Sequence, residues 1–286
     1  MLKMQNNIDV RFARTEDKGA VVAFCQNTFS WGDYITSVYD DWLNDRAGKF
    51  LVATIDQQPV GIAHVAFLGN EVAWMEGMRV HPDYRRRGIG TELDRIGRQV
   101  ARENGCRAAH LVTSMKNIPA QRSLDMEGYH RTAQFNDWEA ESKSEVFSSV
   151  RVATERDLAA IQLIWDKSEI RRASRAVIPN QHWHWKELDP ARLRKKIAAG
   201  EVRLANQGFA IVTPSDQDDW NGLIIYALAG NELAMFELAL GVRGEAAYRG
   251  YAHVEANLAD YAPLNAVLQH AGYRIDGGQY LFEQEL

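Results

Sequence analysis

Apolar residues along the chain follow two spacings: short unbroken runs and helical periods. Phe50 to Ile55 is a run typical of a buried strand, whereas the segment from Gly90 to Asn104 carries apolar residues at helical spacing. In the first half we expect strands over 50–55, 60–68 and 72–80, a helix over 90–104, a strand over 107–113, a helix over 119–127 and a strand from Tyr129. This interleaving predicts the α/β class with a mixed sheet.

Three stretches of the pattern recur in the same order in the second half. The first is Val10-Arg11-Phe12-Ala13 followed by Asp17, which returns at residues 150–153 followed by Asp157. Each copy is typical of a strand that leads into an apolar-periodic helix. The two helices are expected over 17–29 and 157–168.

The second and third recurrences lie further along each half. Residues 69–76 resemble residues 230–237, and in both a Gly-Asn pair separates two apolar runs, which predicts a hairpin. Residues 119–129 resemble residues 263–273, and in both a helix is expected to end at a glycine before a strand.

These matches predict two copies of one fold in tandem, over residues 1–146 and 147–286. The spacing between the matches also predicts a loss in the second copy. It should lack the turn over 85–90 and most of the helix that follows this turn in the first copy.

The segment Arg85-Arg86-Arg87-Gly88-Ile89-Gly90 joins an expected strand to an expected helix. At a helix N-terminus several backbone N–H groups have no intrahelical partner and the dipole is positive. The glycines allow an anion to approach the backbone, and the arginines add positive charge. The segment is therefore a candidate pyrophosphate site. The alternative is an arginine-rich solvated turn that only begins a helix.

Two other phosphate-binding motifs do not fit this turn. A P-loop has Lys and then Ser or Thr after its last glycine, whereas Gly90 is followed by Thr91 and Glu92. A dinucleotide fingerprint has a third glycine at the position of Leu93.

The pattern Arg85-x-x-Gly88-x-Gly90, after a strand that ends in Met78-Arg79-Val80, resembles the signature of the GNAT acetyltransferases. Asn117 matches the second motif of this family, and the resemblance extends over residues 8–138. It implies acetyl-CoA as cosubstrate. The implied contacts of the cofactor are Met78, Arg79, Val80, Arg85, Arg86, Arg87, Gly88, Ile89, Gly90, Thr91 and Asn117.

The second half resembles the same fold in a degenerate form, and tandem proteins of this kind are known in the family. The resemblance therefore implies an acetyltransferase domain over 1–146 and a GNAT-like domain without the pyrophosphate turn over 147–286. We expect one CoA per chain, bound in the first half.

The family transfers an acetyl group directly to an amine, which must be neutral to attack. At pH 7 an α-amine with a pKa near 8 is roughly 10% neutral, whereas a lysine is about 0.04% neutral. Glu76 is the candidate general base, acting through water. The alternative is that Glu76 binds the substrate ammonium or is structural. The acid that protonates the thiolate stays unassigned, because Leu124 stands where many relatives have Tyr.

The segment after the first helix should shape the acceptor site in this fold. Trp31, Asp33 and Tyr34 are candidate substrate-binding residues, since the carboxylate could pair with an amine and the aromatics could form a wall. Equally, the aromatics could be core and Asp33 a helix cap. The Gly-Asp-Tyr segment resembles amino-acid N-acetyltransferases of this superfamily. The aromatics of this region continue to Trp42, and His64 on the adjacent strand could face the same cleft, although we favour a structural role for it. We interpret residues 182–185 (His-Trp-His-Trp) as a packing surface rather than a metal or ligand site.

Composition limits the remaining function classes. A net charge of -5 argues against nucleic-acid binding. Cys25 and Cys106 are too few for a disulfide framework or a zinc site, so no metal is expected. The N-terminus lacks a secretory pattern and the apolar run over 223–229 is too short to span a bilayer. We therefore expect a cytoplasmic protein with no membrane partner, and a homodimer is one assembly that stays open.

The sequence thus predicts an N-acetyltransferase that acts on a small-molecule amine such as an amino acid. Two alternatives stay open. One is a protein acetyltransferase that acts on lysine or an N-terminus. The other is an acyl-CoA-binding sensor without turnover.

Overall fold

The computed structural model describes residues 8–26, 28, 33–69, 71–144, 149–180, 183–215 and 221–286. The chain divides into two compact units, each made of segments that are not continuous in sequence. The first unit comprises Met1–Leu111, Pro119–His130 and Phe282–Leu286, and the second comprises Val112–Ile118 and Arg131–Leu281. The last residues of the chain therefore belong to the first unit. The expected division at 146/147 concerns the two sequence halves and stays a prediction.

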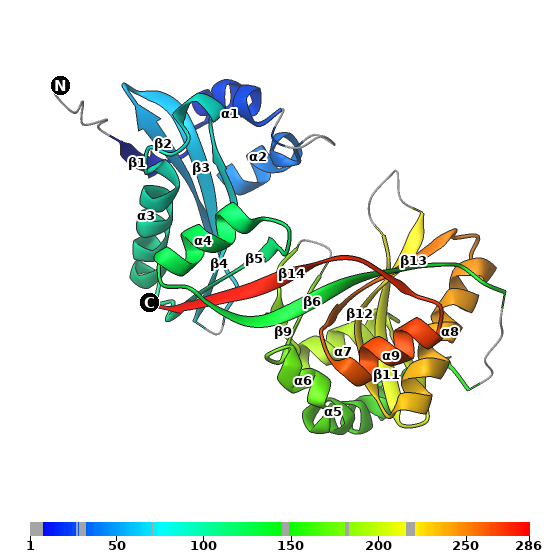
Figure 1. The fold of residues 1–286 in the computed structure, drawn as a ribbon. Coiled ribbons are helices and arrows are strands. Elements are labelled where there is room, and N and C mark those ends of the chain that lie inside the picture. Colours follow the sequence, from blue (N-terminus) through cyan, green and yellow to red (C-terminus); the bar gives the residue numbers. More distant parts are fainter. Residues whose placement is uncertain are drawn as a thin grey trace. The chain divides into compact units, whose positions relative to one another are not determined.

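The first unit is built on strands that follow one another across a sheet: β1 (Asp9–Phe12), β2 (Gly48–Ile55), β3 (Gln58–Phe67), β4 (Val72–Val80) and β5 (Ala108–Ser114). The first four are antiparallel, and β5 runs parallel to β4. Helices α1 (Lys18–Cys25) and α2 (Ile35–Leu43) lie on one face and α3 (Ile89–Glu103) on the other, with α4 (Ile118–Met126) next along the chain (Figure 1).

Alternation along β3 explains why both faces of this sheet are covered. Ile62 packs with buried residues of α1 and α2. A Cβ at Gly61 would lie 2.8 Å from Ile89, so the adjacent position faces α3. Successive side chains of a strand point to opposite faces, and here both faces are apolar. The expected strands and the helix over 90–104 are confirmed.

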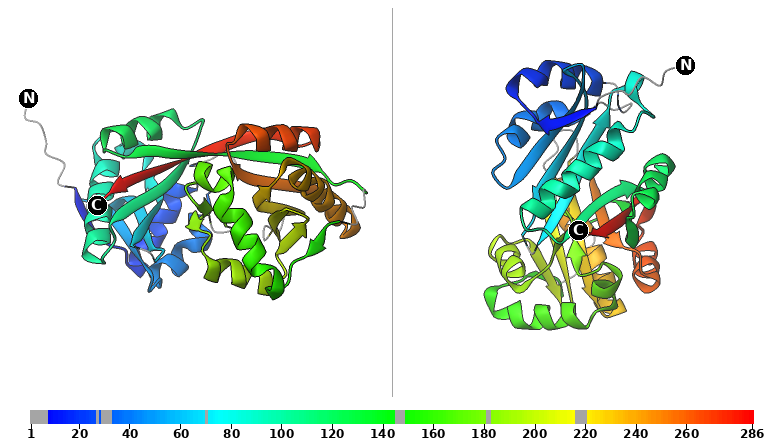
Figure 2. Two further views of the ribbon diagram at one scale, coloured as in Figure 1. Left: turned by 90° about the horizontal axis from the view of Figure 1, so that it is seen from below. Right: turned by 90° about the vertical axis from the view of Figure 1, so that its left-hand side faces the viewer.

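The second unit contains most of the remaining elements. These are β6 (His130–Glu141), β7 (Arg151–Val152), α5 (Leu158–Lys167), α6 (Glu169–Ala173), β8 (Val177–Ile178), β9 (Lys186–Glu187), α7 (Pro190–Ala198), β10 (Val202–Ala205), β11 (Gly208–Pro214), β12 (Gly222–Gly230), α8 (Glu232–Tyr248), β13 (His253–Ala259), α9 (Ala262–His270) and β14 (Arg274–Glu285). Its strands are ordered β14-β6-β13-β12-β11-β10-β7, so β14 lies beside β6, far from it in sequence (Figure 2).

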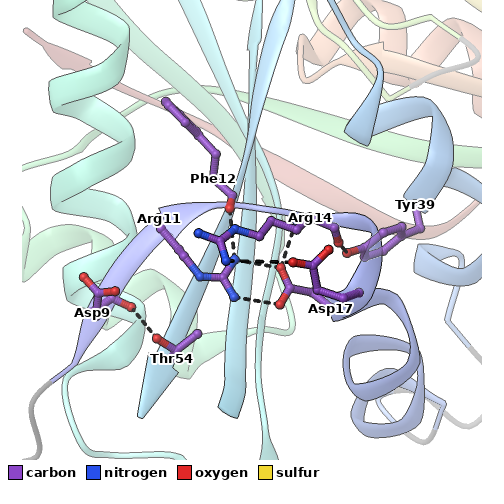
Figure 3. A network of polar contacts seen from close by, with 8 residues as sticks. Asp9, Arg11, Phe12, Arg14, Asp17, Tyr39 and Thr54 are labelled. Carbon is purple, nitrogen blue, oxygen red and sulfur yellow. Dashed lines mark hydrogen bonds and ion pairs between the residues drawn. The ribbon is translucent and has the colours of Figure 1, made fainter. Parts of the chain in front are cut away.

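Two of the recurring stretches have the same structure in both halves. Arg11 and Asp17 form a bidentate ion pair beside β1 (Figure 3), and Arg151 and Asp157 form the same pair beside β7. Helices α4 and α9 are both followed by a left-handed glycine, Gly128 with φ 89° and Gly272 with φ 83°. These matches of the expected repeat are confirmed.

The hairpin expected at residues 230–237 is wrong. The Gly-Asn pair at 69–70 does separate β3 from β4, but Asn231 is the N-cap of α8, and its side chain accepts a hydrogen bond from the Ala234 N–H. Asparagine is favoured both in turns and at N-caps, so the same pair can serve either purpose. Because α8 buries apolar side chains along its length, packing favours the helix here.

The predicted loss of the helix in the second copy is therefore wrong as well. Strand β12 leads directly into α8 and then to β13, which is parallel to β12, just as β4 leads through α3 to the parallel β5. What the second unit lacks, in its described residues, is the connection between strand and helix. Asn231 alone separates β12 from α8, whereas residues 81–88 separate β4 from α3.

Candidate active site

The glycine turn connects β4 to α3 in the first unit. A short 3-10 helix over Pro82–Tyr84 follows β4, and Gly88, with φ 83°, is the N-cap of α3. This left-handed conformation is one that glycine adopts without steric cost. Residues Ile89, Gly90 and Thr91 form the first turn of the helix, where backbone N–H groups have no intrahelical partner. The turn therefore presents several N–H groups and a positive helix end.

The arginines of the turn are partly engaged with neighbouring groups. Arg85 donates to the carbonyl of Val80 at 3.4 Å. Arg87 donates to the carbonyl of Asp83 at 3.0 Å, and its guanidinium lies 4.9 Å from the centre of the Tyr84 ring. These contacts hold the turn in place while the guanidinium groups stay near its surface.

Strand β4 is irregular where it approaches this turn. Opposite the single residue Ala63 of β3, β4 carries the two residues Gly77 and Met78, and Gly77 has φ 65°. This is a β-bulge, which bends the strand and redirects its side chains. Pairs with β5 run from Val72–Ala108 to Trp74–His110, although β4 continues to Val80. Strands β4 and β5 thus stop pairing beyond Trp74.

The helix start and the bulged strand come close together within the first unit. A Cβ built on Gly90 would lie 3.5 Å from Sδ of Met78. Asn117, the remaining predicted cofactor residue, belongs to the second unit, where its backbone N–H donates to Ser114 and its side-chain amide to Oγ1 of Thr113. Its contact with a cofactor stays a prediction.

Glu76 lies directly opposite His64 in the β3–β4 register. Nδ1 of His64 is 2.8 Å from Oε1 of Glu76, and Nε2 of His64 is 3.4 Å from Oδ2 of Asp45. The His64 side chain is 2% exposed and stacks on Trp42, with ring centroids 4.6 Å apart. The structure thus places a histidine between two carboxylates, one of which is the candidate base.

The predicted acceptor residues form a second polar group beside this one. Oδ2 of Asp33 lies 2.7 Å from Nε of Arg79, and the Asp33 side chain is fully buried. Burial alone would lower the pKa of Arg79, but the hydrogen bond with Asp33 raises it. A substrate amine would reach Asp33 only if this pair opened. The Asp33 assignment stays a prediction.

Tyr34 covers the same pair, since its ring centre lies 5.3 Å from the Arg79 guanidinium. Burial raises the pKa of the Tyr34 hydroxyl. Its ring also meets Trp42 edge-on at 6.1 Å. The third predicted acceptor residue, Trp31, lies outside the described residues.

Tyr129 carries a hydroxyl group close in sequence to Leu124, which stands where many relatives have the acid. Its side chain lies in the interior of the first unit. It is buried and donates to Asp94 on α3 at 2.8 Å. Burial, with the Asp94 charge, raises the pKa of Tyr129 well above its ordinary value. Leu124 is also buried, so the general acid stays unassigned.

Of the two tryptophans in residues 182–185, Trp185 is buried whereas Trp183 is 54% exposed. Trp185 is 1% exposed and meets Phe135 edge-on at 5.7 Å, while Trp183 is tilted against Trp185. His182 lies outside the described residues. Among the residues that are described, no group of three or more His, Cys, Asp or Glu side chains could hold a metal ion. No described helix has the length and hydropathy needed to cross a membrane.

Sequence reasoning missed Asp45 as part of the site. It named Trp42 only among the aromatics of the acceptor region, and it favoured a structural role for His64 over a place in the acceptor cleft. Asp45 lies in the loop before β2, and Trp42 near the end of α2. Neither stands in a motif. One local signal was present, because Gly48 and Gly77 occur in strands, where glycine often marks a close approach.

A glycine turn at a helix start, after a bulged strand that carries a carboxylate, is the arrangement that the resemblance to the GNAT acetyltransferases predicted. Residues 17–127 match the model of the acetyltransferase (GNAT) family, so this part of the chain belongs to that family. The predicted family is thereby confirmed for this part of the chain, and the mixed sheet with its helices confirms the predicted α/β fold class.

Solved structures show that the fold extends over the whole chain. A GCN5-related N-acetyltransferase from Sphaerobacter thermophilus is 15% identical, with a TM-score of 0.68 over 97% of this chain and 95% of that one. A tandem GNAT protein from the clavulanic acid biosynthesis pathway is 14% identical, with a TM-score of 0.61 over 98% of both chains. These likenesses concern the fold alone.

A curated relative provides a separate comparison. A histidine N-acetyltransferase of Xenopus tropicalis is 30% identical over 77 residues, which is 27% of this chain and 24% of that protein. The match thus spans about a quarter of the length of that relative.

Proposed function

We propose that the first unit transfers the acetyl group of acetyl-CoA to the primary amine of a small molecule, with free amino acids as the first class to test. The observation that carries this proposal is the position of Glu76 on the bulged strand β4, in the unit that also holds the turn at Arg85–Gly90. The N–H groups of the turn would hold the CoA pyrophosphate, and the backbone of Met78 to Val80 the pantetheine arm.

Glu76 would act on the acceptor as a general base, through water. It takes the proton that the amine must lose, and the neutral nitrogen then attacks the thioester carbonyl. The Glu76 side chain is 13% exposed, so it is sheltered but not sealed from solvent. An α-amine needs less help than a lysine side chain, because a larger fraction of it is neutral at pH 7.

Amino acids are favoured as acceptors by two observations. The Gly-Asp-Tyr segment that precedes α2 resembles amino-acid N-acetyltransferases, and the partial match to the Xenopus tropicalis protein points to the same substrate class. Histidine therefore belongs in any first panel. We propose catalysis only in the first unit, because the second unit has no counterpart of the glycine turn among its described residues.

The proposal is tested by the release of free CoA from acetyl-CoA across an amine panel. The panel contains the free amino acids, polyamines and peptides with either a lysine or a free N-terminus. We expect turnover with one or more amino acids and little with the peptides. Preference for peptides would favour the protein acetyltransferase alternative, and binding of acetyl-CoA without turnover would favour the sensor.

Glu76→Gln tests the base in the same assay. It keeps the size of the side chain but cannot accept the proton, so kcat should fall about 10²-fold or more. Glu16→Gln, on the exposed surface of the first unit, is the matched control and should leave kcat unchanged. A Glu76→Gln enzyme with unaltered turnover at every pH would remove Glu76 from the mechanism.

A further inference from the structure

We propose that His64, supported by Asp45, is a positioning residue that holds the Glu76 carboxylate in its reactive orientation. This inference rests on the proposed function, because it assigns a task to groups around the proposed base. Asp45, His64 and Glu76 would then act together on the acceptor amine, with Glu76 as the base and the other two residues as its support.

The geometry of His64 and Glu76 is set by the sheet. The two residues are direct partners in the β3–β4 register, where side chains point to the same face. An Nδ1–H on His64, 2.8 Å from Oε1 of Glu76, donates one hydrogen bond to the carboxylate. A hydrogen bond at one oxygen restricts the rotation of the carboxylate and so fixes its orientation.

The ring of His64 is itself in contact with two aromatic rings. It lies parallel to Trp42, with an interplanar angle of 3°, and Phe50 meets it edge-on at 6.2 Å. Trp42 in turn sits against Gly77, since a Cβ at that position would collide with its ring. The bulge of β4 thus makes room for the tryptophan that orients the histidine.

Asp45 completes the line on the side away from Glu76. Its Oδ1 accepts the N–H of Ala47 at 2.8 Å, which fixes the carboxylate, and its Oδ2 faces Nε2 of His64. A Cβ at Gly48 would lie 2.7 Å from Nε2 of His64 and would also collide with Asp45. The chain therefore has a glycine at the position where any side chain would separate Asp45 from His64.

A structural role accounts for part of this arrangement, because each ring nitrogen of a buried histidine needs a polar partner and Asp45 lies 3.4 Å from Nε2 without a hydrogen bond to it. It does not account for the carboxylate of the proposed base as the partner of Nδ1, or for the two aromatic rings packed against His64. The same logic orients the base in hydrolytic triads, where a third group fixes the ring that acts on the reacting residue.

Other charged groups around Glu76 bear on its pH dependence. Tyr34 interacts with the Glu76 charge, and the Arg79–Asp33 pair lies beside Tyr34. None of these groups is altered in the variants below. Loss of the His64 donor removes a hydrogen bond that favours the charged carboxylate. The acid limb of the kcat/KM profile should then move to higher pH.

The test uses the full chain with His64→Phe, His64→Asn and Asp45→Asn. Phenylalanine keeps a ring against Trp42 but has no donor, and we expect kcat to fall about 10- to 100-fold, a part of the general-base contribution, with KM for acetyl-CoA unchanged. Asparagine has an N–H near the position of Nδ1 and should restore most of this loss. The kcat of Asp45→Asn should lie between those of His64→Phe and His64→Asn.

A double-mutant cycle separates positioning from structure. If His64 acts through Glu76, adding His64→Phe to Glu76→Gln costs little further kcat, because the base is already absent. Independent, multiplicative effects of the two substitutions would overturn the inference. So would a His64→Phe enzyme with unchanged kcat and an unshifted pH profile. Either result would leave the proposed acetyl transfer intact.

A readout without turnover keeps the inference testable if no acceptor is found. In 15N-labelled protein, with the signal assigned by its absence in His64→Phe, Nδ1 of His64 should be protonated and should respond to Glu76→Gln. An unprotonated Nδ1, or a resonance indifferent to both Glu76→Gln and Asp45→Asn, would overturn the inference. Failure of the amine panel alone would count only against the proposed function.

Discussion

Arg11 donates to both carboxylate oxygens of Asp17, each at 2.7 Å, and so fixes the start of α1 against β1. The same Asp17 accepts the backbone N–H of Arg14 (Figure 3). In the second unit Arg151 and Asp157 form an equivalent pair, at 2.8 and 2.7 Å. The two pairs differ in burial: the Arg11 and Asp17 side chains are 23% and 3% exposed, whereas those of Arg151 and Asp157 are 54% and 16% exposed.

This difference predicts unequal effects of the same substitution. Asp17→Asn removes one partner of a largely buried pair, and the free energy of unfolding should fall by about 2–3 kcal/mol. Asp157→Asn, the matched control, removes an exposed pair and should lower it by about 1 kcal/mol or less. Urea unfolding of the two variants and the wild type measures both. Equal losses would show that burial does not decide the strength of these pairs.

The Asp17 pair also predicts a pH dependence. Burial raises the pKa of Asp17, but the hydrogen bonds from Arg11 and the backbone of Arg14 outweigh it and lower the pKa overall. A lowered carboxyl pKa contributes stability above the unfolded-state value of about 3.9, and this contribution is lost as the pH falls. The difference between wild type and Asp17→Asn should therefore shrink below about pH 4. A difference that stays constant down to pH 2 would contradict this.

Glu255 of β13, in the second unit, predicts the opposite pH dependence of stability: the protein should become less stable as the pH rises. Burial, together with the charges of Asp137, Glu139 and Asp276, raises its pKa to about 7. A raised carboxyl pKa leaves stability intact below the unfolded value of about 4.3, and stability then falls as the pH rises from that value to about 7 and stays lowered above it. Glu255→Gln should then stabilise the protein by about 1–2 kcal/mol at pH 8, discounted for partial exposure, and not at pH 5.

Urea unfolding at the two pH values measures the Glu255 effect. His253 lies on the same strand, with Nδ1 3.8 Å from Glu139, and is unchanged in this comparison. Glu187→Gln, at an exposed position of the second unit, is the control and should show no pH-dependent difference. Stabilisation of equal size at pH 5 and pH 8 would exclude titration of Glu255 as the cause.

Much of this fold follows from local signals, whereas the site depends on register. The strands of the first unit and α3 could be predicted because hydrophobic periodicity is a local signal, and so is the glycine that ends a helix, such as Gly128 after α4. The Gly-Asn pairs at 69–70 and 230–231 carry the same local signal but end as a hairpin and a helix cap, so tertiary packing decided between them. Asp45, His64 and Glu76 meet through the alignment of β2, β3 and β4, which no spacing in the sequence reveals.

The glycines of the turn can be tested for CoA binding separately from folding. Gly90 lies in the first turn of α3, and a Cβ there would only touch Met78, so Gly90→Ala should leave the thermal midpoint unchanged or raise it. The added methyl would stand among the N–H groups proposed for the pyrophosphate. We expect the Kd for CoA to rise about tenfold or more, equivalent to about 1.4 kcal/mol.

Gly88→Ala is the complementary variant for this turn. Gly88 has open space around its Cβ position but a φ of 83°, so alanine should cost about 1 kcal/mol of stability through backbone strain. Titration calorimetry with CoA and thermal unfolding of both variants separate the two effects. An unchanged Kd in Gly90→Ala would argue against pyrophosphate binding at this turn.

Gly48 allows a steric test of the Asp45–His64 contact. Alanine at this position would force Asp45 and His64 apart, so Gly48→Ala should reproduce the kinetic effect of Asp45→Asn. Gly19→Ala is the control, because nothing lies within 4 Å of its Cβ position on α1, and alanine there should stabilise the helix by about 0.5–1 kcal/mol. Wild-type kinetics in Gly48→Ala would show that the Asp45 contact is dispensable.

The last residues of the chain should be needed for the stability of the first unit, to which they belong. Phe282 is 1% exposed, the N–H of Leu286 donates to Arg107 at 2.8 Å, and the Gln284 amide donates to the carbonyl of Glu127 at 3.1 Å. Phe282→Ala should therefore lower the free energy of unfolding by about 3–5 kcal/mol. Deletion of residues 282–286 should cost at least as much, because it also removes these hydrogen bonds.

The same contacts predict that residues 1–146 alone are less stable than this segment within the full chain. In the variant that lacks residues 282–286, limited proteolysis should cut first within residues 8–111. The midpoint of its urea unfolding should be lower than that of the wild type. Glu285→Gln, an exposed change on the same strand, is the control and should behave as wild type. A deletion variant with the wild-type midpoint would mean that the first unit does not depend on these residues, and a fragment over 1–146 should then fold unaided.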